Sequence, residues 1–226
     1  MTAIDTIAPV DSEAEILDLY RAHLSKGRAT LAELFGSHME VASAGAWLRT
    51  SDGEEFLNCG GYGVFIMGAR HPIVMDAVLS QLHAHPISTR ILLEPTVARA
   101  AEALTSVTPR GMDRVHFALS GAEAVETGLK LARAHGKRRL VSMHHGYHGK
   151  TLGALSATAN EVYQKPFRPL LPDVTHVPFG ETETLERELA ARPGEVCVIV
   201  EPVQGEGGVI IPPSGYLTSV AGLCRK

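Results

Sequence analysis

The stretch VCVIV, residues 196–200, has no polar side chain on either face of an extended strand. A strand that is apolar on both sides is typical of a parallel sheet covered by helices on both faces. From residue 114 onward, short apolar runs alternate with segments of helical spacing, which indicates an α/β fold. The strands we expect are 115–119, 140–143, 174–177 and 196–200, and the helices are 72–82 and 95–104, each opened by a proline, 122–135 and 183–191.

The N-terminal residues follow a different pattern. Ser12 and Glu15 have the spacing of a capping box, which predicts a helix that starts after Ser12. The apolar runs 41–48 and 54–58 flank Ser51-Asp52-Gly53, and an Asp-Gly pair between two such runs predicts a hairpin turn. We therefore expect an N-terminal segment over residues 1–60, built from a helix and a hairpin, and a sheet domain over 61–226.

Composition and charge exclude several classes of function. The 226 residues are 45% hydrophobic and 20% charged, as in ordinary globular domains. The formal net charge of −4 gives no general attraction to nucleic acids or acidic membranes, and no apolar run approaches the roughly 20 residues of a membrane span. Cys59, Cys197 and Cys224 are odd in number and far apart, which indicates a reducing compartment and predicts a cytoplasmic location.

Three loops follow expected strands. In an open parallel sheet, ligands bind beyond the carboxyl ends of the strands, so the residues just after each strand are the candidates for ligand contact. The loops are SGA at 120–122, HHGYHG at 144–149 and EPVQGEGG at 201–208. If the sheet is parallel, the three loops share one edge of it.

The first of these loops is a candidate anion site. A helix start exposes unpaired N–H groups and the positive end of the helix dipole, and Gly121 has no Cβ to block a phosphate. SGAE is also a capping box, with Ser120 capping and Glu123 reaching back, so both interpretations stay open. The chain has no G-x-G-x-x-G and no G-x-x-x-x-G-K-[ST] motif, so a phosphate here belongs to a different kind of cofactor. In the helix that follows, Glu126 precedes Lys130 by four residues, a spacing that favours an ion pair.

The other two loops carry an aromatic ring, histidines and carboxylates. Tyr147 either stacks on a flat ligand or packs as an ordinary tyrosine. His144 and His148 lie four residues apart, but the glycines around them disfavour a helix, so we expect no metal site. Glu201 follows an apolar strand and is either ion-paired or part of a site, whereas Glu206 is expected to be solvated unless a basic group meets it.

Five segments, in order and with matching spacing, resemble the class III (ω-) aminotransferases, which are pyridoxal-phosphate enzymes of fold type I. The resemblance implies a large domain with a mixed, mostly parallel sheet and helices on both faces, here incomplete. GKTLGALSATA and KPFRPLLP resemble the putrescine aminotransferases most, and the ornithine and acetylornithine aminotransferases are close. The segments are FLNCGGYGVFIMGARHP (56–72), SGAEAVETGLKLAR (120–133), GYHGKTLGALSATAN (146–160), PFRPLLPDVTHVPFG (166–180) and EPVQGEGGVIIPPSGYL (201–217).

The resemblance also implies roles for individual residues. The cofactor, pyridoxal 5'-phosphate, is expected to be held at its phosphate by the first loop and at its ring by the other two. These cofactor-binding residues are Ser120, Gly121, Ala122, Tyr147, His148 and Glu201. Two further residues, Tyr62 and Glu206, are expected on the substrate side.

The implied reaction is transamination of a diamine or ω-amino acid, such as putrescine or ornithine, with a keto acid such as 2-oxoglutarate, in a homodimer. Two alternatives remain: another fold-type-I activity such as a racemase or decarboxylase, and a non-catalytic binding protein. No residue of this sequence matches the family's Schiff-base lysine or the aspartate that pairs with the cofactor ring nitrogen. We therefore expect no catalytic residue in this chain, which would be the N-terminal half of a longer enzyme and inactive alone. Residues 1–60 would then belong to the small domain and 61–226 to the first part of the cofactor-binding domain.

Overall fold

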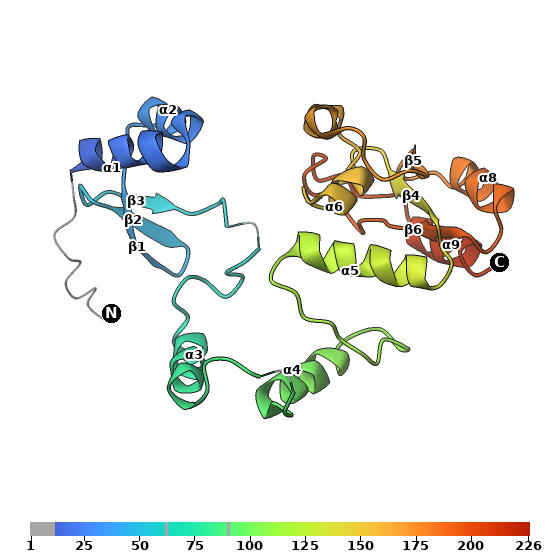
Figure 1. The fold of residues 1–226 in the computed structure, drawn as a ribbon, viewed down its shortest axis with the longest axis horizontal. Helices are drawn as coiled ribbons and strands as arrows, with labels where there is room; N and C mark the ends of the chain where they lie inside the picture. The colour runs from blue at the N-terminus through green and yellow to red at the C-terminus, as the bar shows by residue number, and fades with distance from the viewer. Residues whose placement is uncertain (1–11, 62, 90) are drawn as a thin grey trace. The chain divides into compact units, whose positions relative to one another are not determined.

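The computed structural model describes residues 12–61, 63–89 and 91–226, and the chain forms two compact units, 1–95 and 96–226 (Figure 1). Unit 1 contains a small antiparallel sheet with helices, and unit 2 contains a parallel sheet with helices. The division of the chain at residue 60 stays a prediction. It separates the small domain from the cofactor-binding domain that the resemblance implies, whereas the two compact units are defined by contacts. No described helix combines the length and hydropathy needed to cross a membrane.

The helices of unit 1 begin where the sequence predicts. Ser12 caps helix α1 (Glu13–Leu19), and its Oγ and N–H exchange hydrogen bonds with Glu15, which confirms the capping box. A π-helical turn, η1 (Tyr20–Leu24), leads into α2 (Lys26–Leu34). Helix α3 (Pro72–Ala84) opens on its proline, as predicted.

The sheet of unit 1 pairs β1 (Glu40–Ala44), β2 (Trp47–Thr50) and β3 (Glu55–Leu57) in that order, all antiparallel. The hairpin at Ser51-Asp52-Gly53 is confirmed, since it joins β2 to β3. The apolar run 41–48 is divided between two strands, β1 and β2. The chain turns at Gly45, whose φ of 57° lies in the left-handed region, and Gly45 exchanges two backbone hydrogen bonds with Ala69.

The sheet of unit 2 is parallel throughout, with strand order β5-β4-β6 (Figure 1). Its helices match the expected ones to within two residues wherever one was predicted. The strands are β4 (Arg139–Met143), β5 (Val174–Val177) and β6 (Val196–Val198). The helices are α4 (Pro95–Thr105), which spans the division between the units, α5 (Gly121–Ala134), α6 (Leu152–Ala157), α7 (Glu161–Gln164), the 3₁₀ turn η2 (Lys165–Phe167), α8 (Glu183–Ala191) and α9 (Tyr216–Leu223).

Side chains of the parallel sheet alternate between two hydrophobic clusters. Val141 and Met143 of β4 join a cluster with Leu185 of α8 and Val220 of α9, whereas Leu140 joins one with α5 and α6. The valines of VCVIV pack on the first cluster, and Cys197 and Ile199 pack on the second. The strand that decides the fold is therefore covered on both faces, as predicted. It lies at one edge of the described sheet, however, and the central strand is β4.

The predicted strand at 115–119 is wrong. Residues 113–118 have no regular secondary structure, and Leu119 is 97% exposed. A strand needs a neighbouring backbone to complete its hydrogen bonds. Within the described ranges, no strand of the β5-β4-β6 sheet pairs with this segment. The prediction rested on apolar composition alone, and no neighbouring strand is present to pair with this segment.

Replacement of Leu185 by Ala should test the main cluster. Its side chain is fully buried in that cluster, so Leu185→Ala should lower the free energy of unfolding by about 2–5 kcal/mol. Leu131→Ala, on the exposed face of α5, is the matched control and should change it by less than about 0.5 kcal/mol. Denaturant unfolding measures both. Equal losses in the two variants would contradict this description of the core.

Candidate functional site

A single carboxylate joins the two loops that follow β4 and β6. The backbone N–H of Tyr147 donates to one oxygen of Glu201 at 2.9 Å, and the N–H of Gly205 donates to the other at 3.3 Å. Because β4 and β6 are parallel neighbours, both loops emerge at the same edge of the sheet. Glu201, which the sequence left open between ion pair and site, thus binds loop backbone at this edge.

The same two loops approach each other closely at two further points. The side-chain amide of Gln204, which is buried, donates to the carbonyl oxygen of His144 at 2.8 Å. At Gly207, an added Cβ would lie 2.7 Å from the carbonyl oxygen of His145. Such a contact is too short for any side chain, so the packing of the loops requires glycine at this position.

The first loop reaches this cluster through the start of α5. Ser120 is the N-cap, and its Oγ accepts from the N–H of Glu123 at 3.2 Å. The Glu123 carboxylate reaches back to the N–H of Leu119 at 2.8 Å, so the capping arrangement is present but extends one residue further than predicted. A Cβ added at Gly149 would lie 2.7 Å from the Cβ of Ala122, so the first turn of α5 contacts the second loop. All three loops meet, although no strand precedes the first one.

The start of α5 leaves two donors free. Over the described ranges, no group accepts a hydrogen bond from the N–H of Gly121 or Ala122. A Cβ added at Gly121 would meet no atom within 4 Å. Unpaired amides at the positive end of a helix form an anion site. The capping and phosphate interpretations are therefore compatible, because the cap engages Glu123 and leaves the two preceding amides open.

An aromatic cleft lies beside the second loop. Tyr147 is half-buried, and its ring meets that of Tyr163 edge-on, with centroids 6.5 Å apart. The ammonium of Lys150 lies 4.2 Å from the centroid of the Tyr163 ring. Exposed Glu206 lines the same cleft of about 370 Å³, together with Glu161. Tyr62, the other predicted substrate residue, lies outside the described residues.

His148 is buried with one ring nitrogen unpaired. Its backbone N–H donates to the hydroxyl of Thr158 at 2.9 Å, but its Nε2 has no partner among the described residues. Burial lowers the pKa of His148, and the negative charge of Glu201 opposes this only in part. His148 is therefore a neutral imidazole near pH 7, beside the carboxylate that joins the loops.

The sequence interpretation missed the role of Glu126. Instead of pairing with Lys130, its carboxylate accepts hydrogen bonds from the hydroxyl of Thr151 and from the amides of Gly153 and Ala154. The signal lay in a matched spacing. Ala122 and Glu126 are four residues apart on α5, and the glycines that face them, 149 and 153, are also four apart.

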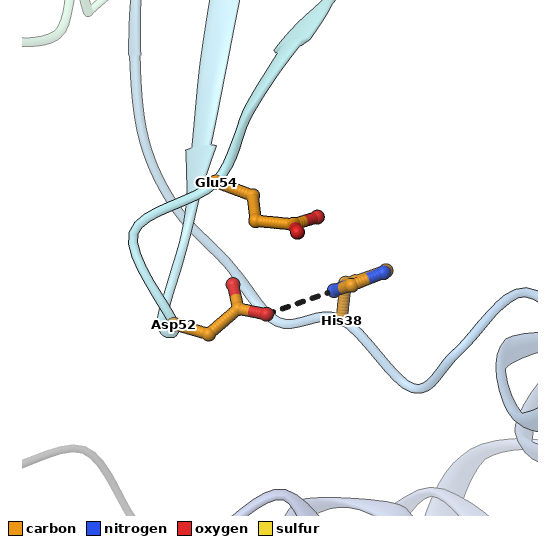
Figure 2. A group of neighbouring side chains, drawn as sticks. All are labelled: His38, Asp52 and Glu54. Atoms are coloured by element: carbon orange, nitrogen blue, oxygen red, sulfur yellow. Dashed lines mark ion pairs between the residues drawn. The ribbon is translucent and has the colours of Figure 1, made fainter.

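A second polar cluster lies in unit 1 and was not predicted (Figure 2). His38, Asp52 and Glu54 place their ligand atoms within 4.8 Å of one another, and Nδ1 of His38 lies 3.3 Å from a carboxylate oxygen of Asp52. All three are exposed or nearly so. The hydroxyl of Thr50 also donates to Asp52, and this bond lowers the pKa of Asp52. Two of the three residues, Asp52 and Glu54, belong to the turn between β2 and β3.

The α/β unit thus presents an open helix start, an aromatic ring and a buried imidazole at one sheet edge, which is where open α/β sheets bind their ligands. Residues 37–226 match the family model for class-III aminotransferases, and the chain belongs to this family.

Solved structures agree with this assignment. An (S)-enantioselective ω-transaminase from Thermomicrobium roseum is 26% identical, with a TM-score of 0.83, and the match covers 96% of this chain and 55% of that one. The ornithine aminotransferase of Toxoplasma gondii ME49 is 25% identical, with a TM-score of 0.84, over 96% of this chain and 52% of that one. The chain thus spans about half the length of these proteins. A further ornithine aminotransferase structure from Toxoplasma gondii, 24% identical, supports the fold alone.

Gly205 and Gly207 of the third loop should respond differently to replacement by alanine. Gly207→Ala places a methyl group against the His145 carbonyl and should lower the free energy of unfolding by about 1–3 kcal/mol while separating the two loops. Gly205→Ala, two residues away, meets open space and should be nearly neutral. Denaturant unfolding, with amide exchange at residues 144–149, measures both effects. Similar behaviour of the two variants would disprove the close approach.

Stability should fall in mild acid. The folded pKa of His148 is lowered from its ordinary value of 6.5, so the unfolded chain takes up the proton first as pH falls. The stabilisation from neutral His148 is therefore complete above about pH 6.5 and is lost on acidification below it. His148→Gln should flatten the decline in melting temperature between pH 7 and 5. His176, whose pKa burial also lowers, should account for a further part. If the melting temperature of the His148→Gln variant falls between pH 7 and 5 as steeply as that of the unmodified protein, His148 is not a source of the acid sensitivity.

Proposed function

We propose that this chain is part of a pyridoxal-phosphate-dependent aminotransferase. The observation that carries the proposal is the pair of open amides at Gly121 and Ala122, held against the loop of Tyr147 by the contact of Ala122 with Gly149. Class membership over residues 37–226 supports the same cofactor. The unpaired Nε2 of His148 and the space in front of Gly121 fit a planar phosphorylated ligand.

In this proposal, each loop has a separate task. The amides of Gly121 and Ala122 bind the phosphate beside the Ser120 cap, and Tyr147 packs on the ring, with His148 next to it. Glu201 keeps the loop of Tyr147 in place through its two backbone hydrogen bonds. When bound, pyridoxal phosphate supplies an electron-withdrawing ring that stabilises negative charge on the carbon bearing the substrate amine. The chain's own residues orient that ring and keep water from one side of it.

The amine donor we propose is a diamine or ω-amino acid of the putrescine or ornithine type, with a keto acid such as 2-oxoglutarate as acceptor. Glu161 and Glu206 both line the cleft beside Tyr147. The Glu161 carboxylate pairs with Arg168, so Glu206 is the carboxylate that would attract a second ammonium group. Likeness to an ornithine aminotransferase and an ω-transaminase supports the same range of donors.

We further propose a homodimer in the cytoplasm. The dimer is supported by class membership and by the exposure of consecutive apolar side chains over residues 64–67, which are an unfavourable surface for a free monomer. The reducing location is supported by three cysteines that are all free thiols.

The decisive experiment uses the complete gene product. Incubation with pyridoxal phosphate, putrescine, ornithine or β-alanine, and 2-oxoglutarate should form glutamate, whereas the 226-residue polypeptide alone should give no turnover. Racemised or decarboxylated products without glutamate would favour another fold-type-I activity. Absence of any pyridoxal-phosphate binding would favour a non-catalytic binding protein and would overturn the proposal.

Gly121→Val should separate phosphate binding from folding. The space around Gly121 accommodates a larger side chain, so the melting temperature should change little. The added methyl groups would cover the two open amides, and we expect the dissociation constant for pyridoxal phosphate to rise roughly tenfold or more. Binding of pyridoxal, which lacks the phosphate, should be almost unaffected, and titration of complete gene product with both compounds measures the difference. Equal weakening for the two compounds would refute a phosphate site here.

A further inference from the structure

We infer that Glu126 is a positioning residue that sets the loop of Tyr147 and His148 against the phosphate-binding start of α5. The inference rests on the proposed function. The Glu126 carboxylate accepts three hydrogen bonds from the segment that follows this loop. The donors and distances are Thr151 Oγ1 at 2.7 Å, Gly153 N at 2.8 Å and Ala154 N at 3.1 Å.

The spacing of residues makes this a two-point attachment. Ala122 and Glu126 lie one turn apart on the same face of α5. Ala122 faces Gly149, where an added Cβ would lie 2.7 Å from its own. Glu126 faces Gly153, where an added Cβ would collide with the carboxylate. One helix face thus fixes both the end of the Tyr147 loop and the start of α6.

Among the described residues, no other side chain caps α6. Thr151, at the N-cap position, makes no capping bond to the helix and donates to Glu126 instead. Residues 153–157 of α6 are all buried, so water cannot replace a lost acceptor at its first amides. The negative charge also lies at the positive end of α6, which is the favourable sense. Glu126 therefore provides, from another helix, the cap that α6 lacks.

The attachment extends to the cofactor loop through Thr158 at the end of α6. Its hydroxyl accepts from the N–H of His148 at 2.9 Å and lies 2.9 Å from the carbonyl oxygen of Gly149. A shift of α6 would therefore move Thr158. Through its two hydrogen bonds, it would also move the backbone of His148 and Gly149, next to Tyr147. Loss of the Glu126 carboxylate should loosen this loop while α5 keeps its own cap at Ser120.

The test is Glu126→Gln in the complete gene product, which keeps one acceptor and removes the charge. Amide exchange at Gly153, Ala154 and residues 146–150 should accelerate about tenfold or more, with β4 unchanged. The dissociation constant for pyridoxal phosphate should rise about tenfold, and the visible circular dichroism of the bound cofactor should change. Thr151→Val removes one donor of the three and should give an intermediate effect, which keeps the test valid if the glutamine variant fails to fold.

Glu188→Gln is the matched control. Glu188 is also half-buried on a helix, but it pairs with Arg139 at the far end of β4. The Glu188→Gln variant should lower the melting temperature. It should change neither the amide exchange at residues 146–154 nor the circular dichroism of the bound cofactor. If Glu126→Gln behaves like this control, the positioning role is refuted. If the unmodified protein binds no pyridoxal phosphate, the proposed function fails, while the exchange measurement still decides whether Glu126 holds the loop.

Discussion

The parallel pairing of β4 with β6 is the constraint on which the site depends. Parallel neighbours end at the same sheet edge, so the chain must leave both strands toward the same region. The pairing alone does not fix the loops, which contain several glycines and would otherwise be free to spread apart. Glu201 joins them by accepting from one amide of each, and Gln204 adds a bond to His144. The site is therefore organised by backbone contacts more than by ion pairs.

Much of this arrangement was predictable because it depends on local chemistry. The capping pattern at Ser12, the hairpin at Asp52-Gly53 and the alternation in VCVIV each depend on residues next to one another in sequence. The meeting of the second and third loops also followed, because strand direction dictates where loops emerge. The first loop joins them although the strand predicted before it is absent from the described sheet. The roles of Ser120, Tyr147 and Glu206 toward a ligand remain predictions, since they concern a group that is not part of the chain.

The errors have a common physical cause, which is dependence on distant partners. Residues 115–119 are apolar enough for a strand, but strand formation also requires an available neighbour. The division of the apolar run 41–48 between two strands also depends on a distant residue, since the chain turns at Gly45 where Ala69 supplies hydrogen bonds. Glu126 has a local partner at the right spacing, but the amides of a buried helix are a stronger requirement than an exposed ion pair. No window of neighbouring residues contains this information.

The position of Cys197 makes β6 an intrinsic reporter of sheet integrity. Its thiol packs between the strand and the α5–α6 side of the sheet, and burial raises its pKa. A protonated, partly buried thiol reacts slowly with alkylating reagents, whereas Cys59 is exposed. Modification of Cys59 would therefore record the folded protein, and modification of Cys197 would record those moments when the edge strand separates from β4.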